Sequence, residues 1–369
     1  MCRQLQGADF EVKAFFPRVI NLGDFGGITR PNAGSRSYEL LTAPVFPTSP
    51  YVYSRWIWGL YGQLCRNDPE VVFYVGEPSE LAAGQVATQV RRACPEARLG
   101  VYVFENIERS WRGKLRWLRG ISERTVLSTL DFAACTSHGA AERLVTLGVP
   151  RQRTRVIYPE TDFNLFTPGD GMTIREHLNM QDSIIVGYVG RMVWEKGVDV
   201  LIKSMRNLPE HYKLLLVGSG RYLDELRKQW TAEDLGERIH HVPRVPQDQV
   251  PEYMRAMDLL VLPSRSIEVW QEQYGRVLAQ AMLCETPVIG SDSGAIPEVI
   301  GDAGIIFPEK DAVRLAAVIA QIGQNPGQRE KLARAGRKRA LDMFVDTYQT
   351  RLADWIRQAA SMPRRSNET

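Results

Sequence analysis

The stretch SIIVGYVGRMVWEKGVDVLI, residues 183–202, decides the fold. It begins with a short run of β-branched and apolar residues, turns at Gly190, and continues after Gly197 as an amphipathic segment. A run of this kind is typical of a parallel strand, and the amphipathic segment of the crossover helix that follows such a strand. The stretch therefore predicts a strand, a tight glycine turn and a helix, which together are the repeating unit of an α/β protein.

The same unit recurs along the chain, because short β-branched runs alternate with amphipathic segments. The expected strands are residues 10–16, 71–75, 99–104, 132–136, 155–158, 183–190, 213–220, 238–242, 258–264, 287–291 and 304–307. A connector rich in Pro, Gly and Asp lies between the fifth and the sixth of them, and we place a domain boundary there, near residue 168. The fold class is therefore α/β, with two doubly wound Rossmann-like domains.

Length and composition agree with two domains. The chain has 369 residues, more than the usual length of two domains, and 44% of them are hydrophobic. We expect one domain over residues 1–168, a second over 169–345, and a C-terminal helix with a polar tail over 346–369. The 46 basic residues nearly balance the 43 acidic ones, so the net charge of +3 gives no support to a nucleic-acid partner.

The cysteines and the apolar runs bear on the compartment. The five cysteines are far apart and never form a CxxC pair, so neither a disulfide framework nor a zinc site is implied, and a reducing cytoplasm fits best. No apolar run approaches the roughly 18 residues that span a bilayer, and the start MCRQLQGADF lacks the apolar centre of a signal peptide. We expect a cytoplasmic protein that is soluble or lies against the inner membrane surface.

The candidate site residues are those just after the strands, because ligands of doubly wound sheets bind beyond the carboxyl ends of the strands. Gly190, Arg191 and Lys196 follow the first strand of the second half. Two cations at a glycine turn suit an anionic ligand such as the diphosphate of a nucleotide. The alternative is that Arg191 and Lys196 are solvated loop charges.

A second group follows later strands of the same half. Glu272 precedes a helix that starts near Tyr274 and Gly275, and its carboxylate is placed to accept hydrogen bonds from sugar hydroxyls. Free backbone N–H groups at this helix start offer a further anion site. The alternative for Glu272 is a favourable charge at a helix N-terminus. Ser293 and Gly294 add a third loop at the same edge of the sheet.

With these loops assembled, the chain resembles a known family, the family 4 retaining glycosyltransferases (glycosyl transferases group 1), which have the GT-B fold of two facing Rossmann-like domains. The motifs that carry the resemblance are GRMVWEKGVDVLIKSM, LLLVGSG, EQYGRVLAQAM and PVIGSDSGAIPEVIGDAG. It covers most of residues 155–345 and is thinner before them, where VFENIERSWRG and CTSHGAAERLVTLGV resemble an acceptor-side domain. It implies retaining transfer of a sugar from a nucleotide-diphosphate-sugar donor to a saccharide or lipid-linked acceptor.

The resemblance also implies roles for residues. Arg191 and Lys196 would hold the donor diphosphate and stabilise the leaving group electrostatically, while Glu272 would bind hydroxyls of the donor sugar. The other donor-binding positions are Gly190, Tyr274, Gly275, Arg276, Gln280, Ser293 and Gly294. No D-x-D sequence occurs in the chain, so we expect no metal and no cofactor beyond the donor itself.

Gln280 departs from the family pattern, which has a second glutamate that binds the ribose of the nucleotide. An amide keeps one acceptor but loses the charge, which would weaken a ribose hydrogen bond by about 1 kcal/mol. The alternative is a helix amide bonded to neighbouring backbone. Because of this substitution, a catalytically impaired relative that binds nucleotide sugars or has a regulatory role is the alternative function.

On the acceptor side, Glu105 follows the strand at 99–104 and is our candidate for the general base. The alternative is a surface carboxylate paired with Arg109. The basic segment ERSWRGKLRWLRG could lie on an anionic membrane as an amphipathic helix, and the alternative is a solvated helix whose tryptophans are in the core or the cleft.

The beginning of the sequence also departs from the family. MCRQLQGADFEVKAFF resembles the end of the family's first helix and its second strand. We therefore expect the N-terminal domain to be truncated and to lack its first strand, a unit of about 30 residues.

Overall fold

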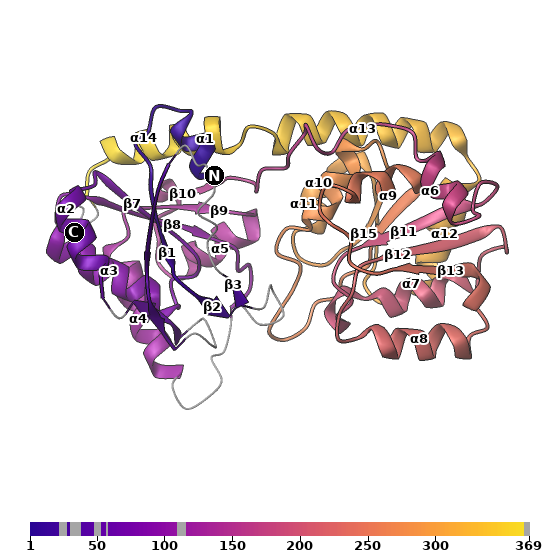
Figure 1. The fold of residues 1–369 in the computed structure, drawn as a ribbon, viewed down its shortest axis with the longest axis horizontal. Helices are drawn as coiled ribbons and strands as arrows, with labels where there is room; N and C mark the ends of the chain where they lie inside the picture. The colour runs from indigo at the N-terminus through magenta and orange to yellow at the C-terminus, as the bar shows by residue number, and fades with distance from the viewer. Residues whose placement is uncertain (22–27, 30–37, 48–52, 57, 109–115, 365–369) are drawn as a thin grey trace. The chain divides into compact units, whose positions relative to one another are not determined.

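The computed structural model describes residues 1–21, 28–29, 38–47, 53–56, 58–108 and 116–364 (Figure 1). The chain divides into two compact units. The first unit is Met1–Tyr158 together with Asp346–Thr369, and the second is Pro159–Val345. The division lies at the start of the connector, before the residue 168 expected from the sequence, and the C-terminal segment belongs to the first unit.

The second unit is built on a six-stranded parallel sheet in the order β13-β12-β11-β14-β15-β16. The strands are β11 (Ile184–Val189), β12 (Tyr212–Val217), β13 (Ile239–Val242), β14 (Leu259–Leu262), β15 (Val288–Ser291) and β16 (Ile305–Phe307). Each of them lies within a strand expected from the sequence or overlaps it. The strand order reverses between β11 and β14, as in a Rossmann fold, and a reversal of this kind opens a crevice at the carboxyl ends of the strands.

Helices cover this sheet, with α7 and α8 on one side and α9 and α10 on the other (Figure 1). The α-helices are α6 (Met172–His177), α7 (Val198–Met205), α8 (Leu223–Ala232), α9 (Val250–Ala256), α10 (Arg276–Leu283), α11 (Ile296–Ile300), α12 (Ala312–Gly323) and α13 (Pro326–Phe344). Short 3₁₀ turns are η4 (Trp194–Lys196), η5 (Gly236–Arg238) and η6 (Gly301–Ala303). The inner strands β11, β12, β14 and β15 are largely buried, which is why their sequences are mainly apolar, whereas the edge strand β13 is half-buried and contains His240 and His241.

The first unit contains a four-stranded parallel sheet in the order β10-β9-β8-β7, and β1 and β4 form a separate parallel pair. The strands are β1 (Lys13–Pro17), β2 (Ile20–Asn21), β3 (Ile28–Thr29), β4 (Glu39–Ala43), β5 (Val45–Phe46), β6 (Arg55–Trp56), β7 (Val71–Val75), β8 (Arg98–Val103), β9 (Phe132–Cys135) and β10 (Thr154–Val156). The helices before residue 158 are α1 (Cys2–Gln6), α2 (Leu60–Asn67), α3 (Leu81–Ala93), α4 (Arg116–Thr129), α5 (His138–Thr146) and the 3₁₀ turn η3 (Arg151–Arg153).

Strands β1 and β7 are edge strands of these two sheets. Two cavities, of about 540 and 580 Å³, are each lined by residues of both strands. Phe15 of β1 and Phe73 of β7 contribute to both cavities. The two sheets of the first unit are therefore separated by space rather than joined by backbone hydrogen bonds in the described part of the chain.

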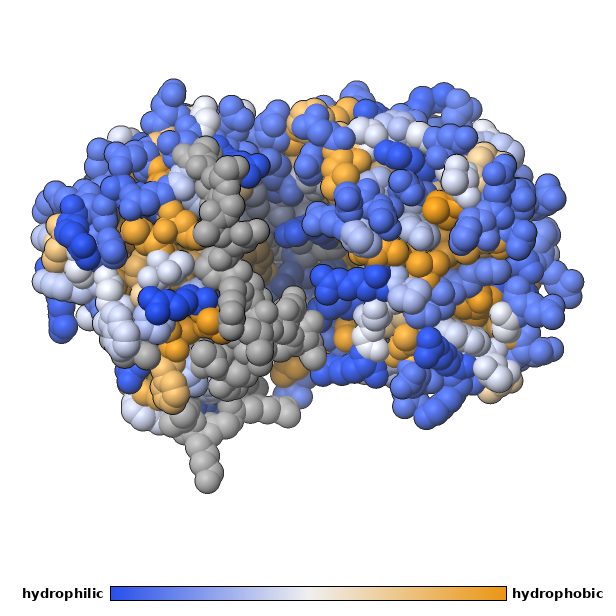
Figure 2. Space-filling model, in the orientation of Figure 1, coloured by the Kyte–Doolittle hydropathy of each residue, from blue (hydrophilic) through white to orange (hydrophobic). Residues whose placement is uncertain are grey.

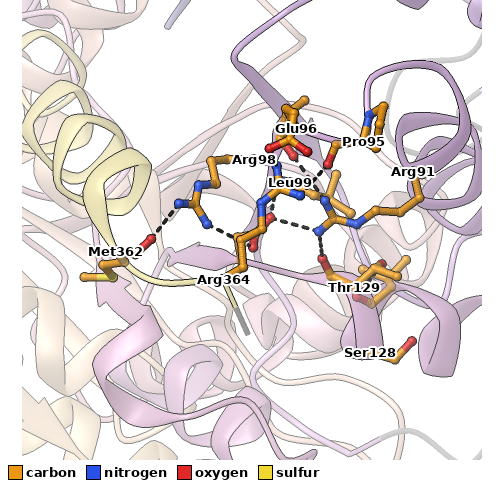
Figure 3. Close-up of polar contacts among 12 residues, drawn as sticks. Arg91, Pro95, Glu96, Arg98, Leu99, Ser128, Thr129, Met362 and Arg364 are labelled. Carbon is orange, nitrogen blue, oxygen red and sulfur yellow. Dashed lines mark hydrogen bonds and ion pairs between the residues drawn. The ribbon is translucent and has the colours of Figure 1, made fainter. Parts of the chain in front are cut away.

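The C-terminal segment returns to the first unit as a π-helical turn (Tyr348–Leu352) and α14 (Ala353–Ser361). Trp355 is buried beside Phe132, and its indole N–H donates to the carbonyl of Ala133 at 3.0 Å. Polar contacts fix the residues that follow: Arg98 donates to the carbonyl of Met362 at 2.6 Å, and Arg364 lies 3.2 Å from Glu96 (Figure 3). The helix that the sequence suggested as a separate C-terminal element thus completes the core of the first unit.

Helix α4 begins with the last five residues, 116–120, of the basic, tryptophan-bearing segment. Trp117 is 58% exposed and Ile121 45%, so Trp117 lies outside the core, whereas Trp111 and Arg109 lie outside the described residues. On the face drawn in Figure 2 the surface is mainly hydrophilic, and hydrophobic residues reach it in small groups. Within the described residues, no helix has the length and apolar character needed to cross a bilayer. Peripheral membrane contact stays a prediction.

Candidate functional site

The turn after β11 brings Lys196 to the loop that follows β14. Gly197 has a φ of +67°, and a Cβ added to it would lie 1.9 Å from the carbonyl oxygen of Pro263. A residue with a side chain would have to move one of the two backbone segments, so only glycine fits here. This close approach sets the turn η4, which ends at Lys196, directly against the carboxyl end of β14.

Lys196 and Glu272 form a buried ion pair, with Lys196 Nζ 2.5 Å from Glu272 Oε2. Their side chains are only 14% and 7% exposed, and the Ser264 hydroxyl donates to the same carboxylate oxygen at 2.7 Å. Burial by itself would raise the pKa of Glu272, but the charge and hydrogen bond of Lys196 and the Ser264 hydroxyl outweigh it and hold the pKa below its ordinary value. Glu272 is therefore ionised at neutral pH.

Arg191 lies close enough to this pair for its charge to lower the pKa of Glu272 further. The buried Tyr188 hydroxyl donates to the carbonyl oxygen of Arg191 at 2.7 Å, which fixes the backbone of the turn after Gly190. The structure thus brings together the three residues that the sequence predicted to act on a donor. The alternative of a solvated loop charge is wrong for Lys196, which is paired and largely buried.

Trp270 is a member of this site that sequence reasoning missed. The Lys196 ammonium lies 5.0 Å from the centre of its ring, within the range of a cation–π interaction. Trp270 closes a tight turn with Ile267, whose N–H donates to the Trp270 carbonyl at 2.8 Å. A tryptophan two residues before a candidate sugar-binding carboxylate was the available signal.

At the start of α10, the Tyr274 side chain packs into the second unit. Gly275 is the N-cap with a φ of +76°, and Arg276, the first helical residue, is exposed. Tyr274 is buried, its ring packs edge-on against Phe344, and its hydroxyl donates to the Pro159 carbonyl at 3.3 Å. The predicted contribution of this segment through backbone amides remains a prediction, and the Tyr274 ring serves packing.

Gln280 is half-buried on the same face of α10 as Val277. Within the described part of the chain its side-chain amide makes no hydrogen bond to the protein, whereas its carbonyl accepts the usual helical bond from Cys284. The alternative of an amide bonded to neighbouring backbone is therefore not what the structure contains.

The loop after β15 packs against Glu272 through backbone. Gly294 has a φ of +53°, and an added Cβ would lie 2.1 Å from the carbonyl oxygen of Glu272, which accepts a hydrogen bond from the N–H of Ala295 at 2.9 Å. Ser293 is fully buried, and its hydroxyl lies 3.1 Å from that of Ser266. The backbone of this loop therefore packs against the backbone of Glu272 and helps to fix its position.

In the first unit, Glu105 is buried rather than on the surface, so the surface alternative is wrong, and Arg109 lies outside the described residues. Glu77, also buried, accepts the N–H of Phe104 at 2.8 Å and that of Glu105 at 2.9 Å. Arg143 lies between the acidic side chains, 3.9 Å from Glu105 and 3.5 Å from Glu77. One arginine thus lies near both carboxylates at the carboxyl ends of β7 and β8, and it also donates to Glu123 at 3.0 Å.

The environment of Glu77 raises its pKa, whereas that of Glu272 lowers it. Burial, and then the neighbouring charge of Glu105, raise the pKa of Glu77 to about 8, although Arg143 opposes them. Sequence reasoning missed Glu77 and Arg143. Glu77 follows its strand as directly as Glu105 follows the next one, so the rule that identified Glu105 would have found it. Arg143 comes from the middle of α5 and has no such signal.

Metal binding was not expected from the sequence. Among the residues that the structure describes, no group of three or more His, Cys, Asp and Glu side chains is placed to hold a metal ion. Independence from metal stays a prediction.

Comparison with known proteins gives a family and relatives. Residues 172–339 match the family described as glycosyl transferases group 1. D-inositol 3-phosphate glycosyltransferase of Mycobacteroides abscessus is 28% identical over 273 residues, which cover 67% of this chain and 60% of that protein. The protein of the same name from Mycolicibacterium smegmatis is 30% identical over 215 residues, 56% of this chain and 48% of that protein. The chain therefore spans less than two thirds of the length of these curated relatives.

Solved structures resemble the whole fold. Those of Anabaena Alr3699/HepE in complex with UDP and with UDP-glucose have TM-scores of 0.74 and 0.69 at 19% and 18% identity, and each comparison covers 87% of this chain and 86% of the other. Sucrose-phosphate synthase from Thermosynechococcus elongatus has a TM-score of 0.72 at 24% identity, covering 97% and 91%. At these identities the likeness shows the fold alone, and it confirms the expected GT-B class with two Rossmann-like domains.

Proposed function

Because residues 172–339 match the family of glycosyl transferases group 1, we propose that the chain transfers a sugar from a nucleotide-diphosphate donor to an alcohol acceptor, with retention of configuration and without a metal. The observation that carries the proposal is the buried Lys196–Glu272 ion pair beside Arg191, at the carboxyl edge of a Rossmann sheet. Such an edge is where ligands of these sheets bind.

Each member of the pair has a role in this reaction. Lys196 has three N–H donors, of which Glu272 takes one, so the others can reach the oxygens of a diphosphate. As the bond to the sugar breaks, negative charge builds on the diphosphate, and the fixed charges of Lys196 and Arg191 stabilise it without having to reorient. Glu272 is ionised and accepts hydrogen bonds from hydroxyls of the donor sugar.

The cations also explain how the site would work without a metal ion. In metal-dependent transfer the ion neutralises the leaving diphosphate, and here two side chains carry that charge. The structures of the Anabaena protein that shares the fold contain UDP and UDP-glucose, which supports a nucleoside diphosphate as the common part of the donor and makes UDP the first compound to test.

On the acceptor side we propose that Glu105 accepts the proton of the attacking hydroxyl. Glu77 binds the backbone on both sides of the Phe104–Glu105 peptide, and Arg143 supplies a positive charge to both carboxylates. We propose a saccharide or lipid-linked acceptor in the cytoplasm, with α4 meeting the membrane through its exposed apolar residues.

A ligand screen followed by turnover assays tests this function. In thermal unfolding with UDP, GDP, ADP, NAD and sugar nucleotides, a ligand at about 100 times its Kd stabilises the protein by about 2.7 kcal/mol. We expect a shift with one nucleoside diphosphate, lost in Arg191→Ala, and donor turnover lost in Lys196→Ala and Glu272→Ala. A shift with NAD alone would contradict the proposal. Binding of a sugar nucleotide without turnover would instead establish the catalytically impaired relative suggested by Gln280.

A further inference from the structure

Glu309, on the loop after β16, holds the loop after β14 at two points. Its Oε2 accepts the backbone N–H of Ser266 at 2.7 Å, and its Oε1 accepts the Ser266 hydroxyl at 2.5 Å. The backbone N–H of Glu309 donates to Asp292 Oδ1 at 2.8 Å, so its own position is tied to the loop after β15. One carboxylate therefore connects the loops that follow three neighbouring strands.

These hydrogen bonds have a fixed direction. A serine hydroxyl has a single proton, and that of Ser266 goes to Glu309. In the 3.1 Å contact between Ser266 and Ser293, Ser293 must then be the donor. The series therefore runs from Ser293 through Ser266 to the Glu309 carboxylate.

The loop that Glu309 holds carries the site. Ser266 directly precedes the turn from Ile267 to Trp270, and that turn sets the Trp270 ring against Lys196. Glu272 follows two residues later. A loop that is anchored at Ser266 on one side and at the Gly294 contact on the other has little freedom to move either side chain.

We propose that Glu309 is a positioning residue, which acts through Ser266 to hold Trp270 and Glu272 in the geometry that fixes Lys196. The inference rests on the proposed function, because Lys196 and Glu272 are the groups that meet the donor. The alternative is that the Glu309 carboxylate only contributes to the stability of the loop. Under that alternative, loss of the two hydrogen bonds from Ser266 would lower stability without lowering kcat.

Turnover kinetics of two variants test the proposal. Glu309→Ala removes both acceptors, and we expect kcat to fall by about 10- to 100-fold, the effect of misplacing a catalytic group by about 1 Å. Glu309→Gln keeps an oxygen for the Ser266 N–H, and its NH₂ can donate to the hydroxyl, so it should recover most of kcat. Asp311→Ala is the matched control, since Asp311 lies on the same loop but caps α12 by accepting the N–H of Arg314 at 2.8 Å. It should lower thermal stability and leave kcat unchanged.

The proposal is overturned if Glu309→Ala keeps wild-type kcat, or if Asp311→Ala loses as much. Hydrogen exchange of the backbone amides from Ser266 to Gln271 gives a readout that does not depend on turnover. Exchange there should be faster in Glu309→Ala than in the wild type, Glu309→Gln or Asp311→Ala, and equal rates in all four would also overturn the proposal. If no donor bound or reacted with the wild type, the proposed function would fail while the exchange result still decided the role of Glu309 in the loop.

Discussion

Two buried glutamates of this protein have opposite proton affinities because of what each one faces. Glu272 faces an ammonium group and a hydroxyl, so its pKa is lowered in spite of burial. Burial, together with the second carboxylate that Glu77 faces, raises the pKa of Glu77 to about 8. In the sequence, both residues are simply glutamates in loops that follow a strand, and nothing local distinguishes their pKa values. Their difference is a property of neighbours that lie far away along the chain.

The raised pKa of Glu77 predicts a pH-dependent stability. The folded protein keeps the Glu77 proton up to about pH 8, whereas the unfolded chain releases it near the ordinary pKa of 4.5. Between these values the folded state binds more protons, so this contribution to the free energy of unfolding is complete below pH 4.5 and is lost as the pH rises towards 8, by at most about 1.4 kcal/mol per pH unit.

Denaturant unfolding of the wild type and Glu77→Gln at pH 5, 6, 7 and 8 measures this dependence. The variant should have the flatter profile. Glu142→Gln is the control, because Glu142 is exposed and the hydrogen bond from Arg151 lowers its pKa, so it does not titrate in this window. Parallel profiles of wild type and Glu77→Gln would show that Glu77 is ionised in the folded protein.

Gln280 offers a second prediction for a single residue. Its amide is half-buried and, in the described part of the chain, has no protein hydrogen bond to give up. We expect Gln280→Glu to bind the nucleoside diphosphate more tightly, by about fivefold if a charged acceptor gains about 1 kcal/mol over an amide. Gln280→Met, of similar size but without an acceptor, should bind more weakly. Calorimetric titration measures both, and unchanged affinities would place Gln280 outside the ribose site.

At the scale of elements, the site is made by close approach of backbone segments, and the turn at Gly197 is the clearest case. Gly197→Ala adds a Cβ that would lie 1.9 Å from the Pro263 carbonyl oxygen, at a φ of +67°. Strain of this kind and the shift that relieves it should destabilise the second unit by about 2–4 kcal/mol. The denaturation midpoint measures the loss. Gly236→Ala is the control, since an added Cβ meets no atom within 4 Å, and equal losses in both variants would rule out the contact as the cause.

At the scale of the whole molecule, the chain leaves the first unit at Tyr158, builds the second, and returns at Asp346. The returning helix α14 contributes Trp355 to the core beside Phe132. Each unit has its own core, so a substitution that disrupts the packing of α14 should lower the stability of the first unit alone.

Trp355→Ala tests this division. Loss of a large buried aromatic side chain costs about 3–5 kcal/mol. In native-state hydrogen exchange, β8 and β9 should lose protection while β11 and β12 keep theirs. Trp117→Ala is the control, because Trp117 is 58% exposed and its loss should change neither unit. Equal loss of protection in β9 and β11 would mean that the two units unfold together.

The α/β class and every strand of the second unit were predictable from the sequence alone, as were the residues that we propose act on the donor, whereas strands β2–β6 of the first unit were not expected. The inner strands of the second unit are short, mainly apolar runs because a parallel sheet is covered on both faces. Gly190, Arg191, Lys196 and Glu272 could be found because a Rossmann sheet binds ligands at the ends of its strands, and position after a strand is visible in a sequence.

Only the tertiary structure decided which side chains meet. Trp270 contacts Lys196, Arg143 reaches Glu105, and Glu309 holds Ser266, each across a separation in the chain that no local pattern records. The return of α14 to the first unit is of the same kind, since its amphipathic pattern identifies a buried face but not the core that buries it. Periodicity is a local property of the chain, whereas these contacts depend on where the folded backbone places distant residues.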